Sequence, residues 1–340
     1  MTSAYDLDLP AMASFLATWN QPAYRASQIW HGLYRDLHRS WSEFSNLPKS
    51  LRQTLEDEMD LATVRPIGHR DSADKRTCKT VFALYDGRQI ETVLMRYNKR
   101  QTLCISSQAG CAMGCVFCAT GQMGFKRHLS AGEIVAQVMY YASTLRAEHR
   151  VLTNIVVMGM GEPLHNYENT MAAIDRLGDA EGFGFGARRI TISTVGLVPM
   201  IRRFADEKRQ VNLAVSLHAA DDELRTSMLP VNRKYDIAAV LDACRYYVAL
   251  THRRVSLEWA LISGVNDTPA QAHRLAALLK GLLCHVNAIP LNPTHGYEGH
   301  PASTERAQAF KAELEHAGIP CTIRLRRGIE IAAGCGQLAV

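Results

Sequence analysis

The fold is decided by residues 102–118, TLCISSQAGCAMGCVFC. An apolar run over 102–107 predicts a strand, and three cysteines in the spacing C-x3-C-x2-C follow it directly. Three thiolates on one loop suit a soft metal centre. Structural zinc sites usually close with four ligands, whereas an iron–sulfur cubane held by three cysteines keeps one iron free for another molecule. The loop predicts a [4Fe–4S] cluster on Cys111, Cys115 and Cys118, with zinc as the alternative.

Short apolar runs alternate with helical stretches through the rest of the chain. The runs that predict strands are 102–107, 153–158, 188–194, 210–216, 254–261, 284–290 and 320–326. The helical stretches are 130–148, 167–178, 197–207, 236–249, 269–281 and 302–317. The first helix opens on a capping-box pattern, Ser130 with Glu133. Serial βα units predict parallel strands, so we expect an α/β fold with a partial (β/α)6 barrel of the TIM type. An open doubly wound sheet is the alternative.

The amino-terminal part differs from the barrel. We assign residues 1–75 to a small helical domain, 76–101 to a β-hairpin extension and 102–340 to the barrel with its carboxyl-terminal segment. The hairpin prediction rests on runs 79–85 and 89–97, which are joined by Asp86-Gly87. Aromatic and basic residues alternate in the helical domain between Tyr24 and Arg39. An RNA-binding module and a helical cap on the barrel both fit this pattern.

Polar residues and glycines follow several predicted strands. In a βα barrel, functional groups gather at the carboxyl ends of the strands. A single Ser or Asn there is usually a turn or helix cap, but polar residues after the second, third, fourth and sixth strands favour a ligand site. The candidate ligand-binding residues are Gly161, Glu162, Ser193, Ser216, Leu217, His218 and Asn292.

Two cysteines outside the loop are candidates for chemistry. Cys335 stands between two glycines near the carboxyl terminus, a setting that predicts an open, flexible thiol. Cys104 lies in the first barrel strand, where a functional role and a buried apolar role are equally compatible with the residues. The remaining cysteines predict small buried hydrophobes: Cys78, Cys244, Cys284 and Cys321.

The composition of the chain is that of an ordinary globular protein. It has 340 residues, 47% of them hydrophobic and 21% charged. No apolar run approaches a membrane span, and the amino terminus carries no basic region of the signal-peptide kind, so we expect a cytoplasmic protein. The net charge of +5 permits a nucleic-acid partner without requiring one.

Several stretches resemble the RlmN/Cfr family of radical S-adenosylmethionine (SAM) enzymes. The resemblance runs from about Tyr24 to the carboxyl terminus. The matching stretches are 102–108, 111–118, 119–125, 159–163, 216–218, 230–232 and 335–338. The resemblance implies the partial barrel of the radical SAM type, a [4Fe–4S] cluster on the three loop cysteines, and SAM bound by the strand-end residues.

The resemblance also implies a reaction. Members of the family methylate an adenine of 23S rRNA at the peptidyl-transferase centre. RlmN enzymes act on carbon 2 and also modify the adenine beside the anticodon of certain tRNAs, whereas Cfr enzymes act on carbon 8. Residues 121–125 and 286–293 look more like the RlmN branch, so we expect carbon 2. The alternatives are carbon 8 and a radical SAM reaction on a substrate other than RNA.

Roles for single residues follow from the same resemblance. Cys335 matches the cysteine that takes a methyl group from one of two SAM molecules, and Cys104 matches the thiol that later forms a transient disulfide with it. Glu91 matches a proton acceptor, although the residues alone predict a solvated strand carboxylate. We expect a monomer served by an electron donor such as flavodoxin or ferredoxin. Candidate contacts to RNA phosphates are Arg188, Arg189, Arg324, Arg326 and Arg327.

Overall fold

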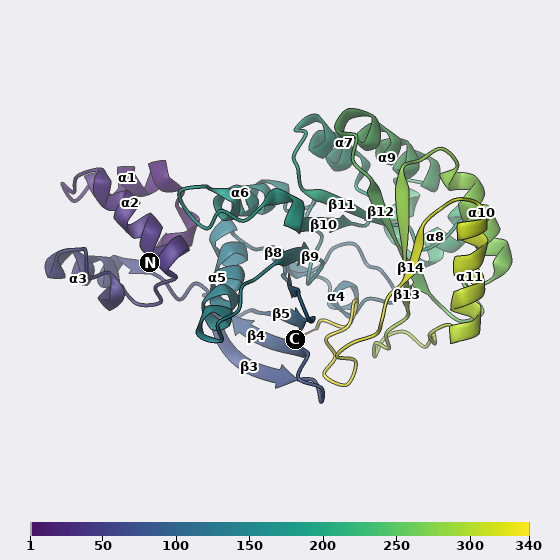
Figure 1. Ribbon diagram of the computed structural model, residues 1–340, viewed down its shortest axis with the longest axis horizontal. Helices are drawn as coiled ribbons and strands as arrows, with labels where there is room; N and C mark the ends of the chain where they lie inside the picture. The colour runs from purple at the N-terminus through teal and green to yellow at the C-terminus, as the bar shows by residue number, and fades with distance from the viewer. Residues whose placement is uncertain (1, 340) are drawn as a thin grey trace.

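One continuous sheet forms the centre of the molecule. The computed structural model describes residues 2–339. The sheet has ten strands in the order β14-β13-β12-β11-β10-β9-β6-β5-β4-β3 (Figure 1). Strands β6 to β14 of this sheet pair in parallel, and β5, β4 and β3 continue it antiparallel. Within the described residues β14 and β3 are its two edges, so the barrel is partial, as the sequence predicted.

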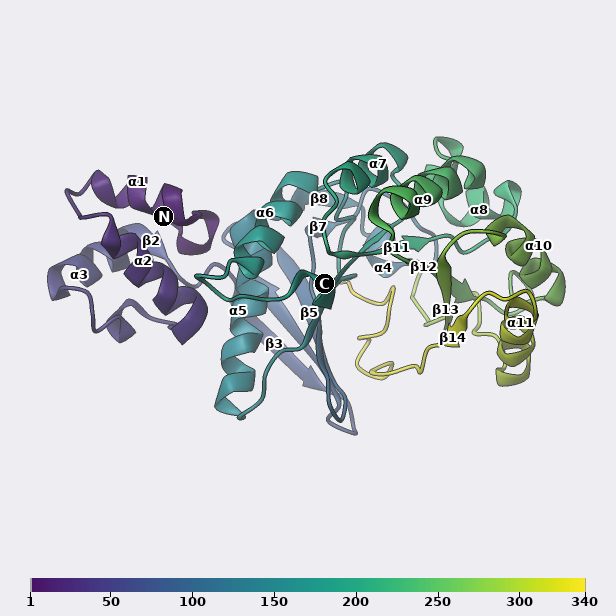
Figure 2. The same cartoon turned by 45° about the horizontal axis from the view of Figure 1, so that its top comes forward.

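The parallel strands alternate with helices in the predicted order. The strands are β6 (Gln101–Cys104), β9 (Asn154–Val157), β10 (Ile190–Thr194), β11 (Asn212–Ser216), β12 (Val255–Leu261), β13 (Cys284–Pro290) and β14 (Cys321–Ile323). The helices are α5 (Ala131–Ala147), α6 (Tyr167–Gly178), α7 (Val198–Asp206), α8 (Asp222–Met228), α9 (Ile237–Thr251), α10 (Pro269–Leu279) and α11 (Thr304–His316). They follow the outer side of the curved sheet, while the carboxyl-terminal segment crosses its inner side (Figures 1 and 2).

Local sequence explains where these helices begin and which face they bury. Helix α5 starts with the predicted capping box, in which the Ser130 hydroxyl and the Glu133 carboxylate each accept from the other residue's backbone N–H. Helix α7 buries Ile201 and Phe204, whereas Arg203 between them stays exposed. Short 3₁₀ turns precede β10 (η4, Ala187–Arg189) and follow α8 (η5, Pro230–Arg233).

No helix within residues 2–339 has the length and apolar character needed to span a bilayer.

The antiparallel extension has three strands, one more than predicted. The predicted hairpin is confirmed as β4 (Thr77–Ala83) and β5 (Gln89–Arg96), with Gly87 in the left-handed region at φ +78°. Strand β3 (Arg65–Asp71) pairs with β4, although the sequence analysis placed this stretch in the helical domain. It was missed because it is an edge strand of mostly exposed polar residues, which lacks the alternation that identifies a half-buried strand.

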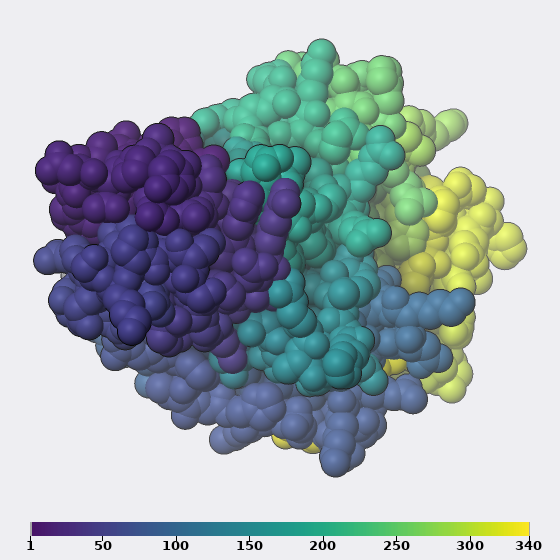
Figure 3. All heavy atoms as spheres, turned by 60° about the vertical axis from the view of Figure 1, so that its left-hand side comes forward, coloured from purple at the N-terminus to yellow at the C-terminus, as the bar shows by residue number. Residues whose placement is uncertain are grey.

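Residues 2–60 form a helical domain beside α5 and α6 (Figures 1 and 3). Its elements are β1 (Thr2–Ser3), η1 (Ala4–Asp6), α1 (Leu9–Ala17), α2 (Tyr24–His31), the π-helical turn η2 (Gly32–Asp36), η3 (Trp41–Glu43), α3 (Lys49–Glu58) and β2 (Met59–Asp60). The aromatic residues Trp30 and Tyr34 are buried in its core. Arg35 donates to the carbonyl of Ala180 at 2.8 Å, and Arg39 stacks on Tyr140. These side chains therefore pack the helical domain against the barrel, as expected for a helical cap.

A buried arginine joins the loops at the carboxyl ends of β10 and β11. Arg225 of α8 is fully buried and donates to the carbonyls of Val195 (2.8 Å), Ser216 (3.2 Å) and Leu217 (3.1 Å). It also donates to the side chain of Asn232 at 2.6 Å. Burial lowers the pKa of Arg225 to about 10, which leaves it charged at neutral pH. Its guanidinium holds two strand ends in fixed relation.

Replacing Arg225 by methionine removes these bonds and leaves the carbonyls buried without donors. We expect the free energy of unfolding to fall by about 3 kcal/mol, as measured by urea denaturation followed by circular dichroism. Arg203→Met is the matched control, because Arg203 is an exposed arginine on α7. Equal stability of the two variants would contradict this role for Arg225.

Candidate active site

A cavity opens at the carboxyl ends of the parallel strands. Its lining includes the three loop cysteines, Gly161, Glu162, Ser193, Ser216, His218, Asn292 and Cys335. The predicted ligand-binding residues thus meet in one place, with one exception. Leu217 is fully buried outside the lining, and its backbone N–H donates to the carbonyl of Glu258 at 3.1 Å. Its neighbours Ser216 and His218 face the cavity instead.

The cysteine loop leaves the barrel through a two-stranded ribbon that the sequence did not predict. Strand β7 (Gln108–Gly110) pairs with β8 (Phe125–His128), and the short helix α4 (Ala119–Gln122) begins directly after Cys118. The loop is anchored across the barrel, because the N–H of Val116 donates to the carbonyl of Met228 at 3.1 Å. All three loop thiols are free, and they line the same cavity.

The spacing of the three thiols distinguishes a cluster from a single ion. Zinc–sulfur bonds of about 2.3 Å place the thiolates of one tetrahedral zinc roughly 3.8 Å apart. Within residues 2–339 the one group of three ligand atoms that lie within 4.8 Å of one another is elsewhere, at His69, Asp71 and Cys78. The loop thiols are therefore spread more widely than the ligands of one ion. This spread argues against the zinc alternative.

The loop after β9 brings a carboxylate and two close-packed glycines to the cavity. Gly161 has φ +101°, and a Cβ there would lie 2.5 Å from Cβ of Gln108, so no other residue fits. Glu162 is buried, and its oxygens accept from the N–H groups of Leu164 (3.0 Å) and Val195 (2.8 Å). Burial raises the pKa of Glu162 to about 7. Each oxygen keeps a lone pair for a further donor.

His218 is held as a neutral hydrogen-bond donor. Its Nδ1 accepts from the backbone N–H of Ala260 at 2.9 Å, which places the proton on Nε2. Burial lowers the pKa of His218 to about 3, so the ring is uncharged at neutral pH. The residue has φ +61°, a strained conformation for a side chain of this size. Phe117 of the cysteine loop packs edge-to-face on the ring, with 5.0 Å between centroids.

Asn292 carries the clearest sign of a missing ligand. Its side-chain N–H donates to the carbonyl of Cys335 at 3.0 Å, while its buried Oδ1 has no partner among the described residues. A buried acceptor without a donor costs free energy, so this atom predicts a donor from a bound molecule. Gly334 allows the approach, since a Cβ there would lie 2.6 Å from the Asn292 nitrogen.

The carboxyl-terminal segment is anchored, contrary to the flexible thiol expected from the glycines around Cys335. The carbonyl of Gly336 accepts from the N–H of Ala119 at 2.7 Å, and the carbonyl of Leu338 accepts from Thr120 at 2.6 Å. Gln337 donates to the carbonyl of Pro293 at 3.0 Å. These bonds fix the segment against the cysteine loop and the end of β13. Cys335 keeps solvent access because it faces hollows on both sides.

A second cavity adjoins the first, and Cys335 lines both. Cys104 of β6 also lines the second cavity, together with Arg324, Arg326 and Arg327. Burial raises the pKa of Cys104 to about 12. The crowded pocket around the Cys335 sulfur also raises the pKa of that thiol, although the residue is open to solvent on one side, and Arg324 opposes both shifts. The two stray cysteines of the sequence therefore share a pocket. The other predicted phosphate contacts, Arg188 and Arg189, lie in η4 at the opposite end of β10.

Glu91 lies apart from both cavities. It is 2% exposed, so the solvated carboxylate expected from the residues alone is wrong. Its Oε1 forms an ion pair with Lys79 at 2.7 Å, and its Oε2 accepts from the N–H of Ala339 at 2.8 Å. Burial raises the pKa of Glu91, and Lys79 opposes this shift. The carboxylate ties the end of the chain to the sheet.

Sequence reasoning missed one carboxylate of the first cavity. Glu258 of β12 is buried, lines the cavity and accepts from Asn287 at 3.1 Å. Burial raises its pKa. The available signal was a single acid in the middle of the apolar run 254–261, because acidic side chains are rarely buried unless they have a partner or a functional role.

Comparison with known proteins supports the family resemblance. A radical SAM superfamily model matches residues 105–276, and a model of the ribosomal RNA large subunit methyltransferase N-terminal domain matches residues 3–61. The chain is 51% identical over 334 residues to dual-specificity RNA methyltransferase RlmN 1 of Myxococcus xanthus, covering 98% of this chain and 93% of that protein. It is 48% identical over 346 residues to the probable dual-specificity RNA methyltransferase RlmN of Chloroflexus aurantiacus, covering 98% and 92%.

A solved structure agrees over almost the whole molecule. The crystal structure of a radical SAM methyltransferase from Sphaerobacter thermophilus matches with a TM-score of 0.98 and 51% identity, covering 99% of each chain. The matched domains include both the barrel and the amino-terminal helices. The chain therefore belongs to the RlmN family of radical SAM RNA methyltransferases.

Proposed function

We propose that this enzyme methylates carbon 2 of an adenine in 23S rRNA, and of the adenine 3′ to the anticodon in some tRNAs. The observation that supports the proposal most directly is the position of Cys335, which lines both cavities. A group carried on its sulfur can face the first cavity when it is loaded and the second when it is delivered. The family names of the relatives support an RNA substrate.

The first cavity is the proposed site of the cluster and SAM. Cys111, Cys115 and Cys118 hold the [4Fe–4S] cluster, which when reduced supplies the electron that cleaves SAM into a radical able to remove a hydrogen atom. Glu162 and Asn292 offer acceptor oxygens to the donor groups of SAM, and the Nε2–H of His218 offers a donor. Ser193 and Ser216 add hydroxyls to the same lining.

Cys335 and Cys104 carry the methyl group and release the product. The Cys335 thiol loses its proton and takes a methyl group from one SAM, which forms a thioether. After hydrogen removal with a second SAM, the carbon joins the adenine and links RNA to protein. The resulting radical adduct loses one electron, which the cluster would take back, and the carbon-2 proton, for which Glu91 is the proposed acceptor. The Cys104 thiolate then attacks the Cys335 sulfur and forms the S–S bond, while the electrons of the broken C–S bond stay on the carbon, which takes a proton from solvent to complete the methyl group.

The second cavity is the proposed entrance for the RNA base. Its rim carries Arg326 and Arg327, and the guanidinium of Arg327 lies 4.6 Å from the Tyr97 ring centroid. Arg100 also stacks on Tyr97, at 4.4 Å. Cations beside a half-buried aromatic ring suit a single-stranded backbone with unstacked bases. The amino-terminal helical domain is the proposed second contact for RNA, and the chain acts as a monomer with a flavodoxin or ferredoxin as reductant.

Nucleoside analysis distinguishes the two carbon positions. Anaerobically reconstituted enzyme should convert adenine to 2-methyladenine in protein-free 23S rRNA and in tRNA, as read by mass spectrometry against both methyladenosine standards. A product with the chromatographic mobility of 8-methyladenosine would favour the Cfr-type reaction. Formation of 5′-deoxyadenosine without any methylated nucleoside would favour a substrate other than RNA.

The Cys104→Ala variant should stop after the methyl carbon has joined the base. Because no thiol remains to attack Cys335, we expect labelled RNA to migrate with the protein on a denaturing gel. Cys284→Ala is the control, since Cys284 is buried at the start of β13, outside both cavities. Normal turnover by Cys104→Ala would refute the assigned role.

The Asn292→Ala variant should bind SAM about tenfold more weakly, because one buried hydrogen bond is lost. Equilibrium dialysis with cluster-loaded enzyme measures this directly. Asn212→Ala is the control at the opposite end of the barrel, where Asn212 donates to the carbonyl of Arg188 at 2.7 Å. Unchanged SAM affinity in Asn292→Ala would show that the orphan oxygen faces no SAM donor.

A further inference from the structure

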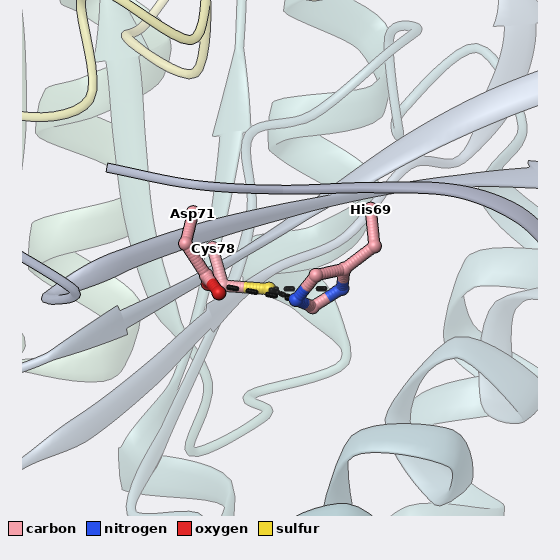
Figure 4. Close-up of side chains that lie close together, drawn as sticks. All are labelled: His69, Asp71 and Cys78. Atoms are coloured by element: carbon pink, nitrogen blue, oxygen red, sulfur yellow. Dashed lines mark hydrogen bonds and ion pairs between the residues drawn. The ribbon is translucent and has the colours of Figure 1, made fainter. Parts of the chain in front are cut away.

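A second group of potential metal ligands lies on the edge of the sheet, away from the cysteine loop. His69 and Asp71 belong to the edge strand β3, and Cys78 belongs to β4 (Figure 4). Asp71 is paired with Cys78 across the two strands, and His69 is two residues from Asp71, so all three share one face of the sheet. From its sequence Cys78 is expected to be a small buried hydrophobe, and no local signal marks His69 or Asp71 as a ligand.

The two separations from His69 match those between ligands of a single tetrahedral ion. Both ring nitrogens of His69 lie 3.5 Å from the Cys78 sulfur, Nε2 lies 3.5 Å from Oδ1 of Asp71, and the three ligand atoms lie within 4.8 Å of one another. Zinc bonds of about 2.3 Å to sulfur and 2.0 Å to nitrogen or oxygen place such ligands roughly 3.3–3.5 Å apart. A turn of the half-exposed His69 ring, which points the Nε2 lone pair between the other two ligands, closes the three ligands around one zinc ion.

The surrounding residues are arranged as outer partners of metal ligands usually are. Nδ1 of His69 lies 3.3 Å from the Thr80 hydroxyl, which can hold the ring with Nε2 free. The Tyr141 hydroxyl lies 2.7 Å from the Thr80 oxygen and 3.4 Å from the Cys78 sulfur. The nearby cation Arg96 is engaged by Glu148 at 2.8 Å. Cys78 is buried, whereas His69 and Asp71 are half exposed, so an ion can enter from solvent.

We propose that His69, Asp71 and Cys78 form a zinc site with one open position for water. Binding replaces the thiol proton of Cys78 by a zinc–sulfur bond and releases that proton to solvent. Three protein ligands with a half-exposed entrance predict a weaker site than a closed four-cysteine site. The ion joins the edge strand β3 to β4 through side chains, in addition to the backbone ladder.

The position of the site gives the ion a structural consequence. Asp71 and Cys78 flank the turn of residues 72–77, and the turn contacts the carboxyl-terminal segment. The N–H of Ala73 donates to the Glu330 carboxylate at 3.2 Å, and a Cβ at Gly328 would lie 2.8 Å from the Thr77 methyl group. Zinc stiffens the turn on which the segment carrying Cys335 rests. The effect of this stiffening on methyl transfer by Cys335 rests on the proposed function, whereas the zinc site itself does not.

Metal analysis of the cluster-loaded enzyme tests the site itself. Anaerobically reconstituted protein, washed with a chelator and dialysed against zinc chloride, should hold one zinc per chain while its iron content stays constant. Cys78→Ser and His69→Gln should each weaken zinc binding at least tenfold. Cys321→Ser is the matched control, a buried cysteine on β14 at the opposite edge of the sheet. Asp71→Asn and His69→Gln alter half-exposed side chains, so the test survives a folding defect in Cys78→Ser.

Zinc K-edge absorption separates this site from the cysteine loop. We expect one sulfur and three nitrogen or oxygen neighbours around the zinc. A shell of three sulfurs, or zinc binding that is equal in all variants, would overturn the proposal.

Hydrogen exchange at residues 72–77 should slow when zinc is added to the wild type and stay unchanged in His69→Gln. Loss of zinc with RNA methylation intact leaves the proposed function standing, so the two claims fail separately.

Discussion

The hydrogen bond from the N–H of Ala119 to the carbonyl of Gly336, at 2.7 Å, is the constraint on which the site depends. Ala119 follows the last loop cysteine, and Gly336 follows Cys335. The bond therefore fixes the distance between the cluster loop and the thiol that is proposed to carry the methyl group. Thr120 and Gln337 strengthen the same junction through the carbonyls of Leu338 and Pro293. Without this junction Cys335 would not separate two cavities.

The barrel surrounds this junction with buried polar groups that are either uncharged or held by backbone hydrogen bonds. His218 is kept uncharged by burial, and its tautomer is set by the N–H of Ala260. Glu162 is partly satisfied by two backbone donors, while Asn292 retains a buried oxygen without a partner. The charge of Arg225 is offset by carbonyls from two strand ends. A cavity built in this way is suited to bind a zwitterionic cofactor that brings its own charges.

The sequence predicted the features that local periodicity and spacing encode. The strand–helix alternation, the capping box at Ser130 and the turn at Gly87 were found in this way, as were the polar strand ends. The features that were missed depend on contacts distant in sequence. Strand β3 is polar and exposed, Glu258 is an isolated acid in an apolar run, and the anchoring of Cys335 comes from backbone bonds to Ala119. Glycines beside Cys335 predicted flexibility, because no local signal reveals such partners.

A label-transfer experiment tests the central claim that Cys335 carries the methyl group. Enzyme whose Cys335 has been loaded with a ¹³C-methyl group, freed of labelled SAM, is given unlabelled SAM and a stoichiometric amount of RNA for one turnover. The account predicts that the methylated adenine carries the ¹³C label and that the label disappears from the Cys335 peptide. An unlabelled product, with the label retained on Cys335, would contradict it.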